Sequence, residues 1–346
     1  MLAGAGVDAL LVMHPPNIRY LTGFTGSAAL LLMQPARTVL VTDFRYAVQA
    51  EQEAGTAAII EIERSSVWDR LRRVLDKAPP DALGIEAHAV TVRDAERIGE
   101  QLRGRVVPTR DLVERLLVSK APGEVAAIRA AAELAQHALA EILPTVRAGE
   151  RELDVASRLE GTLRRLGSEW HPFQTIVASG PRSALPHART TARQLARGEW
   201  LLLDFGAQVD GYCADLTRTV AIGRADERQR EVYEIVRAAQ ERARLGVRAG
   251  MTGREADALA RDPISARGFG DAFGHSLGHG LGLEVHEAPR LAATADEPIP
   301  MGAVVTVEPG IYLPGWGGVR LEDDIHLGPD GPELLSDGRT ELVELS

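Results

Sequence analysis

The sequence is poor in cysteine and contains no long hydrophobic run. Cys213 is the only cysteine among 346 residues, so no internal disulfide can form, and this fits a reducing compartment. No apolar run approaches the roughly 20 residues that a membrane-spanning helix needs. Residues 1–6 contain no basic residue that would begin a signal peptide. We therefore expect a cytoplasmic protein with no membrane partner.

Basic residues are also in deficit. Lys and Arg together number 39 against 49 Asp and Glu, which gives a formal net charge of −10. No block of Lys and Arg interrupts this acidity, and a nucleic-acid-binding protein would present a basic face. We therefore expect no nucleic-acid partner. The hydrophobic content of 45% and the charged content of 25% are ordinary for a globular protein.

The chain is long enough for two domains. Short apolar runs alternate with helical patterns up to residue 118, which predicts an α/β domain over residues 1–118. Strands are expected at 8–13, 28–33, 38–42, 57–62 and 82–86, and helices at 44–54, 67–77 and 92–103. Residues 119–346 are expected to form an α+β domain of helices and hairpins. Its helices are predicted from Pro122, over 153–166 and 227–245, and from the capping box that begins at Thr252.

Two acidic residues lie in apolar strand patterns of the second part. Asp204 follows Trp200-Leu201-Leu202-Leu203, and Asp215 precedes Leu216. Asp210-Gly211 between these runs predicts a hairpin. A turn at 209–210 would place Asp204 opposite Asp215, and a turn at 210–211 would make them diagonal neighbours. Both registers put the two carboxylates on one face, where they would repel each other unless a cation lies between them.

A second pair of strand patterns repeats this arrangement. The run 303–308 ends at Glu308, and the run 319–326 carries Glu322, Asp323 and Asp324. Alternation places Glu322 and Asp324 on one face, so the pattern alone does not choose between them.

A glycine-rich segment between these strand pairs holds three histidines. It runs from Phe273 to Glu287 and contains His275, His279 and His286. Four carboxylates with one histidine form an oxygen-rich ligand set that suits divalent manganese, cobalt, iron or zinc. Two divalent cations balance four negative charges, so the sequence predicts a dinuclear site of the kind that supports hydrolysis.

Five segments together resemble a known family. LLLDFGA, CADLTRT, GHSLGHGLGLEVHE, VVTVEPGIY and VRLEDDI occur in this order and resemble the ligand segments of the pita-bread (creatinase/aminopeptidase) dinuclear metallopeptidases. The similarity is greatest to the Xaa-Pro peptidases, prolidase and aminopeptidase P, and residues 17–24 resemble their N-terminal domain. The resemblance implies five metal ligands: Asp204, Asp215, His279, Glu308 and Glu322. It also implies that Asp215 and Glu322 bridge both ions.

The resemblance also implies roles around these ligands. Glu308 would move the proton of the attacking water. His187 and His286 would hold the substrate and stabilise the tetrahedral intermediate. Arg290 would meet the substrate carboxylate, and Arg320, with Thr217, would orient the ligand carboxylates. It further implies two divalent ions, Mn²⁺ first with Co²⁺, Zn²⁺ or Fe²⁺ as alternatives, and a homodimer. The N-terminal domain would limit substrate length, with residues 43–46 as the candidate wall.

The favoured function is hydrolysis of the Xaa-Pro bond, with dipeptides preferred over longer peptides. The alternatives are an aminopeptidase P, a methionine aminopeptidase, a metal-free amidinohydrolase similar to creatinase, and a non-catalytic binding module of the same fold. The residues before 119 argue against the methionine aminopeptidase, and the complete acidic set argues against the last two. For His275 both an orienting role and packing stay open, His171 is expected at the rim or in a structural role, and Cys213 is expected to be a buried apolar residue.

Overall fold

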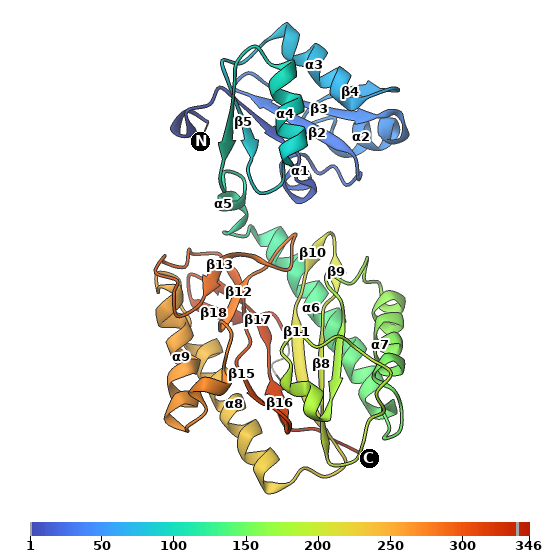
Figure 1. The fold of residues 1–346 in the computed structure, drawn as a ribbon, viewed down its shortest axis with the longest axis vertical. Helices are drawn as coiled ribbons and strands as arrows, with labels where there is room; N and C mark the ends of the chain where they lie inside the picture. Colours follow the sequence, from blue (N-terminus) through green and yellow to red (C-terminus); the bar gives the residue numbers. More distant parts are fainter. Residues whose placement is uncertain (1, 337–338) are drawn as a thin grey trace. The chain divides into compact units, whose positions relative to one another are not determined.

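The computed structural model describes residues 2–336 and 339–346. The chain divides into two compact units, Met1–Leu117 and Val118–Ser346, which are coloured in sequence order in Figure 1. No helix within the described ranges is long and apolar enough to cross a membrane.

The N-terminal unit is a six-stranded sheet covered by helices on both faces. The strand order is β4-β3-β2-β1-β5-β6, and β1 pairs antiparallel with β2 and parallel with β5. The strands are β1 (Ala9–Val12), β2 (Ala29–Gln34), β3 (Arg37–Asp43), β4 (Ile59–Glu63), β5 (Ala82–Glu86) and β6 (Arg105–Thr109). The helices are η1 (Ala3–Ala5), α1 (Pro15–Thr22), η2 (Phe44–Tyr46), α2 (Ala47–Ala54), α3 (Val67–Lys77), α4 (Val92–Gln101) and α5 (Glu114–Leu117).

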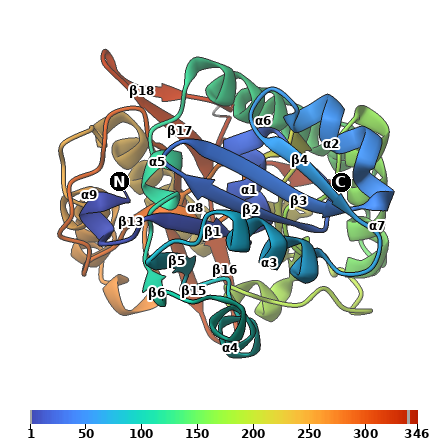
Figure 2. The ribbon, with the colours of Figure 1, turned by 90° about the horizontal axis from the view of Figure 1, so that it is seen from above.

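Alternation along the central strands explains the two covered faces. Leu11 and Leu32 pack against α3 and α4, whereas Leu10 and Leu31 pack against α1 and α2, and Figure 2 shows these helix pairs on opposite sides of the sheet. The predicted α/β class is confirmed. The sequence patterns did not indicate α1 or β6, and the expected helix 44–54 is split into η2 and α2.

In the C-terminal unit, residues 118–336 and 339–346 form four sheets flanked by helices. A four-stranded sheet has the order β19-β11-β8-β7, a five-stranded sheet the order β13-β12-β14-β17-β18, and β9-β10 and β15-β16 are two-stranded ribbons. The first strands are β7 (Ile176–Ser179), β8 (Glu199–Phe205), β9 (Gln208–Val209), β10 (Tyr212–Cys213), β11 (Leu216–Ile222) and β12 (Gly278–Gly280). The others are β13 (Glu287–Leu291), β14 (Val304–Val307), β15 (Gly310–Leu313), β16 (Gly317–Arg320), β17 (Asp323–Gly328), β18 (Gly331–Leu334) and β19 (Glu344–Leu345).

Its long helices form two groups. They are α6 (Pro122–Ile142), α7 (Glu152–Leu166), α8 (Glu227–Gly246) and α9 (Gly253–Ala266), with short turns η3 (Leu143–Thr145), η4 (Gly180–Ala184) and η5 (Gly270–Ala272). One core cluster joins α6 and α7 to β8 and β11, and another joins α8 and α9 to β14 and β17. Figure 1 shows α9 on the opposite side of this unit from α7. The predicted capping box at Thr252 is present, and Gly167 ends α7 with a positive φ of 115°.

The first acidic hairpin has the second of the two predicted registers. Tyr212 pairs with Val209, so Asp210 and Gly211 form the turn, with φ values of 49° and 77°. Positive φ at both central residues defines the turn type that matches the twist of a hairpin. Asp204 therefore lies opposite Thr217 and diagonal to Asp215.

The second strand pair differs from the prediction. β14 pairs with β17, as expected for 304–307 and 323–326, but Val319 and Arg320 pair with β15. The Pro309-Gly310 sequence after Glu308 ends β14 and begins an extra ribbon, which breaks the predicted run 319–326 into two strands. Glu322 lies at the break between β16 and β17.

A buried ion pair connects the two large sheets. Arg218 Nη2 on β11 lies 2.7 Å from Asp323 Oδ1 on β17, and the Asp323 side chain is fully buried. Gln240 Nε2 and Ser336 Oγ also donate to this carboxylate. Asp323 thus links the strand that follows Asp215 to the strand that follows Glu322.

We expect Asp323→Asn to lower the free energy of unfolding by about 3 kcal/mol, because it leaves the Arg218 charge buried without its counter-ion. Chemical denaturation of the chelator-treated protein measures the change. Glu234→Gln, in an exposed pair with Arg237, is the matched control and should cost less than about 1 kcal/mol. Equal effects of the two substitutions would contradict this interpretation of Asp323.

Candidate metal centre

One cavity in the C-terminal unit brings the predicted site residues together. Its volume is about 1320 Å³. The predicted metal ligands, histidines and arginines all line it: His187, Asp204, Asp215, His279, His286, Arg290, Glu308, Arg320 and Glu322. They come from β8, β12, β13, β16 and the segments between strands.

His279 lies among the carboxylates with its Nε2 atom facing them. This nitrogen is 3.4 Å from Glu308 Oε1 and 3.9 Å from Asp215 Oδ2. The other ring nitrogen, Nδ1, lies 3.0 Å from the carbonyl oxygen of Gly280, so it carries the proton and leaves a lone pair on Nε2. Burial lowers the pKa of His279 to about 4, which keeps the imidazole neutral as a metal ligand requires.

Three carboxylates of the cavity influence one another, with Asp215 and Glu322 buried and Glu308 half-buried. Burial and the charge of Glu322 raise the pKa values of Asp215 and Glu308 well above their usual range. Burial and the charge of Asp204 raise the pKa of Glu322 to about 8. Such shifts mean that ionised forms need a compensating cation.

Orphaned oxygen atoms provide a test of the fit to a metal ion. Asp215 Oδ1 and Glu322 Oε1 are buried and accept no hydrogen bond from any described residue. Ligand atoms of Asp215, His279 and Glu322 all lie within 4.8 Å of one another. Buried oxygens without donors are costly unless something else satisfies them, so the donor set fits divalent cations.

Asp204 differs from the other carboxylates because it already has a cationic partner. Arg320 Nη2 donates to Asp204 Oδ2, and this contact lowers the pKa of Asp204. Burial raises the pKa by more, so it lies above its usual value. Arg320 Nε also donates to Thr217 Oγ1 over 3.1 Å, and this hydroxyl donates to Glu322 Oε2 over 2.6 Å. Arg320 and Thr217 thus have the contacts expected of residues that orient carboxylates.

The structure adds Tyr312, which the sequence patterns did not single out, and it separates Asp324 from Glu322, between which the strand pattern did not choose. Tyr312 Oη lies 2.8 Å from both Arg320 Nη1 and His275 Nε2, which gives His275 a polar connection to the cavity. Asp324 does not contact the cavity, and its Oδ2 atom accepts the backbone N–H of Asp215 over 3.0 Å. Tyr312 could have been noticed, since it is the last residue of the segment VVTVEPGIY that carries Glu308. The contact of Asp324 depends on sheet packing.

The remaining predicted residues surround the carboxylates. The rings of His286 and His279 have centroids 4.5 Å apart. Burial and the nearby His187 lower the pKa of His286. His187 follows η4 in the chain, and Arg290 on β13 pairs with His279 on β12 and is exposed.

Other candidates lie outside the cavity lining. Cys213 is buried, and its thiol pKa is raised to about 12 by burial, which agrees with the expected apolar role. The ring of His171 packs on Trp170 at 4.8 Å. In the N-terminal unit, Asp43 caps η2 and pairs with Arg45 at 2.7 Å.

Comparisons with known proteins identify the family of this chain. Residues 126–329 match metallopeptidase family M24, and residues 1–116 match the creatinase/prolidase N-terminal domain. The chain is 34% identical over 340 residues to an Xaa-Pro dipeptidase of Pyrococcus furiosus, covering 97% of this chain and 95% of the relative. This chain belongs to metallopeptidase family M24.

Solved structures show the same fold over nearly the whole chain. An Xaa-Pro dipeptidase from Bacillus anthracis has a TM-score of 0.97 at 41% identity and covers 99% of this chain and 97% of its own. An X-Pro aminopeptidase from Thermotoga maritima has a TM-score of 0.91 at 38% identity, with 98% of each chain covered. The expected creatinase-type N-terminal domain and pita-bread catalytic domain are confirmed.

The raised carboxylate pKa values predict how stability depends on pH without metal. In the unfolded chain Glu322 ionises near 4.5, whereas in the folded chain its pKa is about 8. Between these values the folded state binds more protons, so stability falls as the pH rises. We expect the unfolding temperature of the chelator-treated protein to fall between about pH 5 and 8, and Mn²⁺ to remove most of the fall.

Thermal scans across this pH range, with and without Mn²⁺, measure the effect. Glu322→Gln should reduce the slope, whereas Glu133→Gln, on the exposed surface of α6, should leave it unchanged. A metal-free protein that becomes more stable over this interval would contradict the prediction.

Proposed function

We propose that this protein is a metal-dependent peptidase that hydrolyses the bond before proline in Xaa-Pro dipeptides. The observation that carries the hydrolytic part is that Asp204, Asp215, Glu308, Glu322 and His279 line one cavity, with buried oxygens of Asp215 and Glu322 lacking hydrogen-bond donors. The preference for proline is supported by the names of the relatives from Pyrococcus furiosus and Bacillus anthracis.

The proposed ligands of two divalent ions are Asp204, Asp215, His279, Glu308 and Glu322. When bound, such a pair of ions polarises the scissile carbonyl and lowers the pKa of a water molecule toward neutrality. Divalent metal dependence follows from the family, and Mn²⁺ is our proposal for the ion. A homodimer and a cytoplasmic location stay predictions from the sequence.

Glu308 is the proposed proton carrier. Its Oε1 atom lies in the cavity 3.4 Å from His279 Nε2, among the other proposed ligands. From this place it can accept a proton from the attacking water and release it to the leaving nitrogen. The leaving nitrogen of an Xaa-Pro bond carries no N–H and belongs to a ring with fixed φ. It therefore needs a proton from the enzyme, but no acceptor for a peptide N–H.

The histidines and arginines divide the remaining tasks. His187 and His286 line the cavity beside the carboxylates, where their ring N–H groups can donate to the oxygen on which negative charge develops. Arg290 on β13 offers a cation for the C-terminal carboxylate of the proline in an Xaa-Pro dipeptide. Arg320 and Thr217 hold the carboxylates through the contacts described above.

A panel of small peptides tests the substrate. We expect Ala-Pro to be hydrolysed, Ala-Ala to be left intact, chelation to abolish turnover and Mn²⁺ to restore it. Ala-Pro-Ala should be cleaved more slowly than Ala-Pro. Equal or faster cleavage of the tripeptide would replace the dipeptidase proposal by an aminopeptidase, the description carried by the relative from Thermotoga maritima.

Asp215→Asn tests the ligand assignment against a matched control. We expect kcat to fall by about a thousandfold or more, since the metal pair contributes several kcal/mol to transition-state stabilisation. The bound metal, measured by elemental analysis, should fall as well. Asp210→Asn makes the same chemical change in the turn of the same hairpin, outside the cavity lining, and should leave both quantities unchanged. A fully loaded, active Asp215→Asn protein would contradict the assignment.

A further inference from the structure

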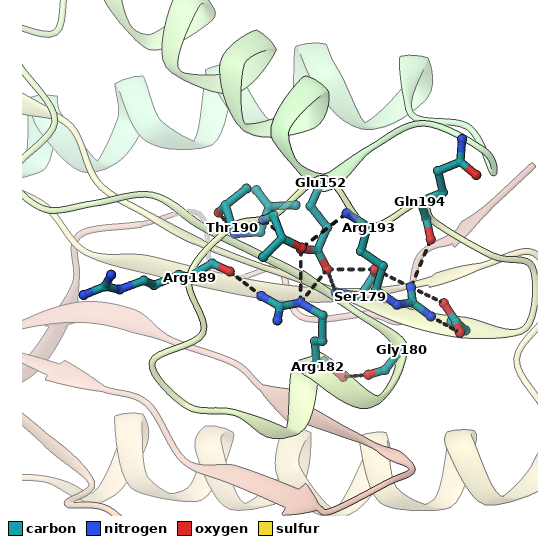
Figure 3. A network of polar contacts seen from close by, with 12 residues as sticks. Glu152, Ser179, Gly180, Arg182, Arg189, Thr190, Arg193 and Gln194 are labelled. Atoms are coloured by element: carbon teal, nitrogen blue, oxygen red, sulfur yellow. Dashed lines mark hydrogen bonds and ion pairs between the residues drawn. The ribbon is translucent and has the colours of Figure 1, made fainter.

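A buried glutamate connects both ends of the segment that carries His187. Glu152 is the first residue of α7, and its side chain has no exposed surface. Figure 3 shows its carboxylate at the centre of a polar network that includes Ser179, Arg182 and Arg193. The site described above does not use this residue.

Each oxygen of the Glu152 carboxylate binds one end of the segment 180–190. Oε1 accepts the backbone N–H of Ser179 over 2.8 Å and its hydroxyl over 2.9 Å. Oε2 accepts the backbone N–H of Thr191 over 3.0 Å and its hydroxyl over 2.7 Å. Because one rigid carboxylate binds both residues, the distance between the ends of the segment is fixed.

Arg182 carries this restraint into the segment itself. Its Nε atom lies 3.2 Å from both oxygens of Glu152, and its Nη2 atom donates to the carbonyl oxygen of Arg189. The chain thus turns back on itself between Arg182 and Arg189, with His187 in the part between them. Without Glu152 the guanidinium would lose its buried counter-ion and with it the position from which it reaches Arg189.

Other contacts also hold the segment, on both sides of His187. Before it, Ser183 Oγ accepts the N–H of Gly318 over 2.8 Å, and the carbonyl oxygen of Pro186 accepts from Arg320 Nη1 over 3.2 Å.

Beyond His187, the hydroxyl of Thr190 accepts the N–H of Val177 over 2.9 Å and donates to the carbonyl oxygen of Thr175 over 3.0 Å. Each of these contacts acts on one side of His187. Glu152 differs from them because its carboxylate binds both ends of the segment and also the Arg182 guanidinium.

We propose that Glu152 is a positioning residue for His187. It closes the base of the segment 180–190 and so keeps the His187 imidazole against the cavity. The need for an acceptor is specific: five distinct donor groups converge on its two oxygens. An amide at this position would offer one acceptor oxygen and turn an NH₂ group toward donors.

Glu152→Gln tests the proposal through a double-mutant cycle with His187→Ala. We expect Glu152→Gln to lower kcat/KM for Ala-Pro by about tenfold or more, because a misplaced contact group loses transition-state stabilisation. In the His187→Ala background the same substitution should change kcat/KM by less than about twofold. Bound metal should stay at the wild-type level. Equal losses in both backgrounds, or loss of metal, would overturn the positioning role.

Because this role rests on the function proposed for His187, a second measurement is independent of catalysis. Hydrogen exchange of the chelator-treated protein should show faster exchange in Glu152→Gln for peptides covering 180–190, with the rest of α7 and β8 unchanged. Unchanged exchange in this segment would overturn the proposal even if the enzyme acts on Xaa-Pro peptides. Faster exchange in a protein without Xaa-Pro turnover would support the restraint and contradict only the proposed substrate.

Two further variants distinguish loss of this restraint from general unfolding. Thr191→Val removes one hydroxyl donor from Oε2 while keeping the shape of the side chain, and should reproduce both effects in weaker form. Glu150→Gln is the matched control, because Glu150 is also buried in part and pairs with Arg158 at 2.7 Å, but does not contact 180–190. It should leave the exchange of this segment and kcat/KM unchanged. Effects of Glu150→Gln as large as those of Glu152→Gln would overturn the proposal.

Discussion

Concentration of negative charge away from water is the constraint on which the catalytic unit depends. Asp204, Asp215, Glu308 and Glu322 line one cavity with little exposure to solvent, and burial raises the pKa of each. A protein can keep such carboxylates away from water only if they are protonated or if positive charge lies beside them. The two strand pairs and the neutral His279 make sense as a frame that holds this charge for cations to neutralise.

The distribution of arginine and lysine supports this interpretation. Structural acids of this unit have cationic partners: Asp323 pairs with Arg218, and the buried Asp257 pairs with Arg261 at 2.5 Å. By contrast, no described lysine or arginine lies within ion-pair distance of Asp215, Glu308 or Glu322. The fold thus neutralises these structural acids within the chain. It leaves Asp215, Glu308 and Glu322 for something from outside the chain, whereas Asp204 pairs with Arg320.

Much of this arrangement was predictable because carboxylates in apolar strands are visible as exceptions to alternation. Asp204 and Asp215 could be placed on one face from the hairpin alone, and positive φ at Asp210 and Gly211 then selected the register. The choice between Glu322 and Asp324 could not come from periodicity, since the β15–β16 ribbon interrupts the run that carries them. Glu152 was missed because Ser179 and Thr191, its partners, lie 27 and 39 residues further along the chain.

The site combines two kinds of support with different mechanical properties. The carboxylates come mainly from strands or strand ends, where ladder hydrogen bonds resist displacement of one acid relative to another. His187 and His286 come from segments between strands, which lack a ladder, and an ion pair lies beside each segment, Arg182 with Glu152 and Lys120 with Glu287. The spacing of the charges can therefore stay constant while the proposed substrate contacts change through a few residues near these ion pairs. Such a division explains how one metal frame can serve peptidases that differ in the peptides they accept.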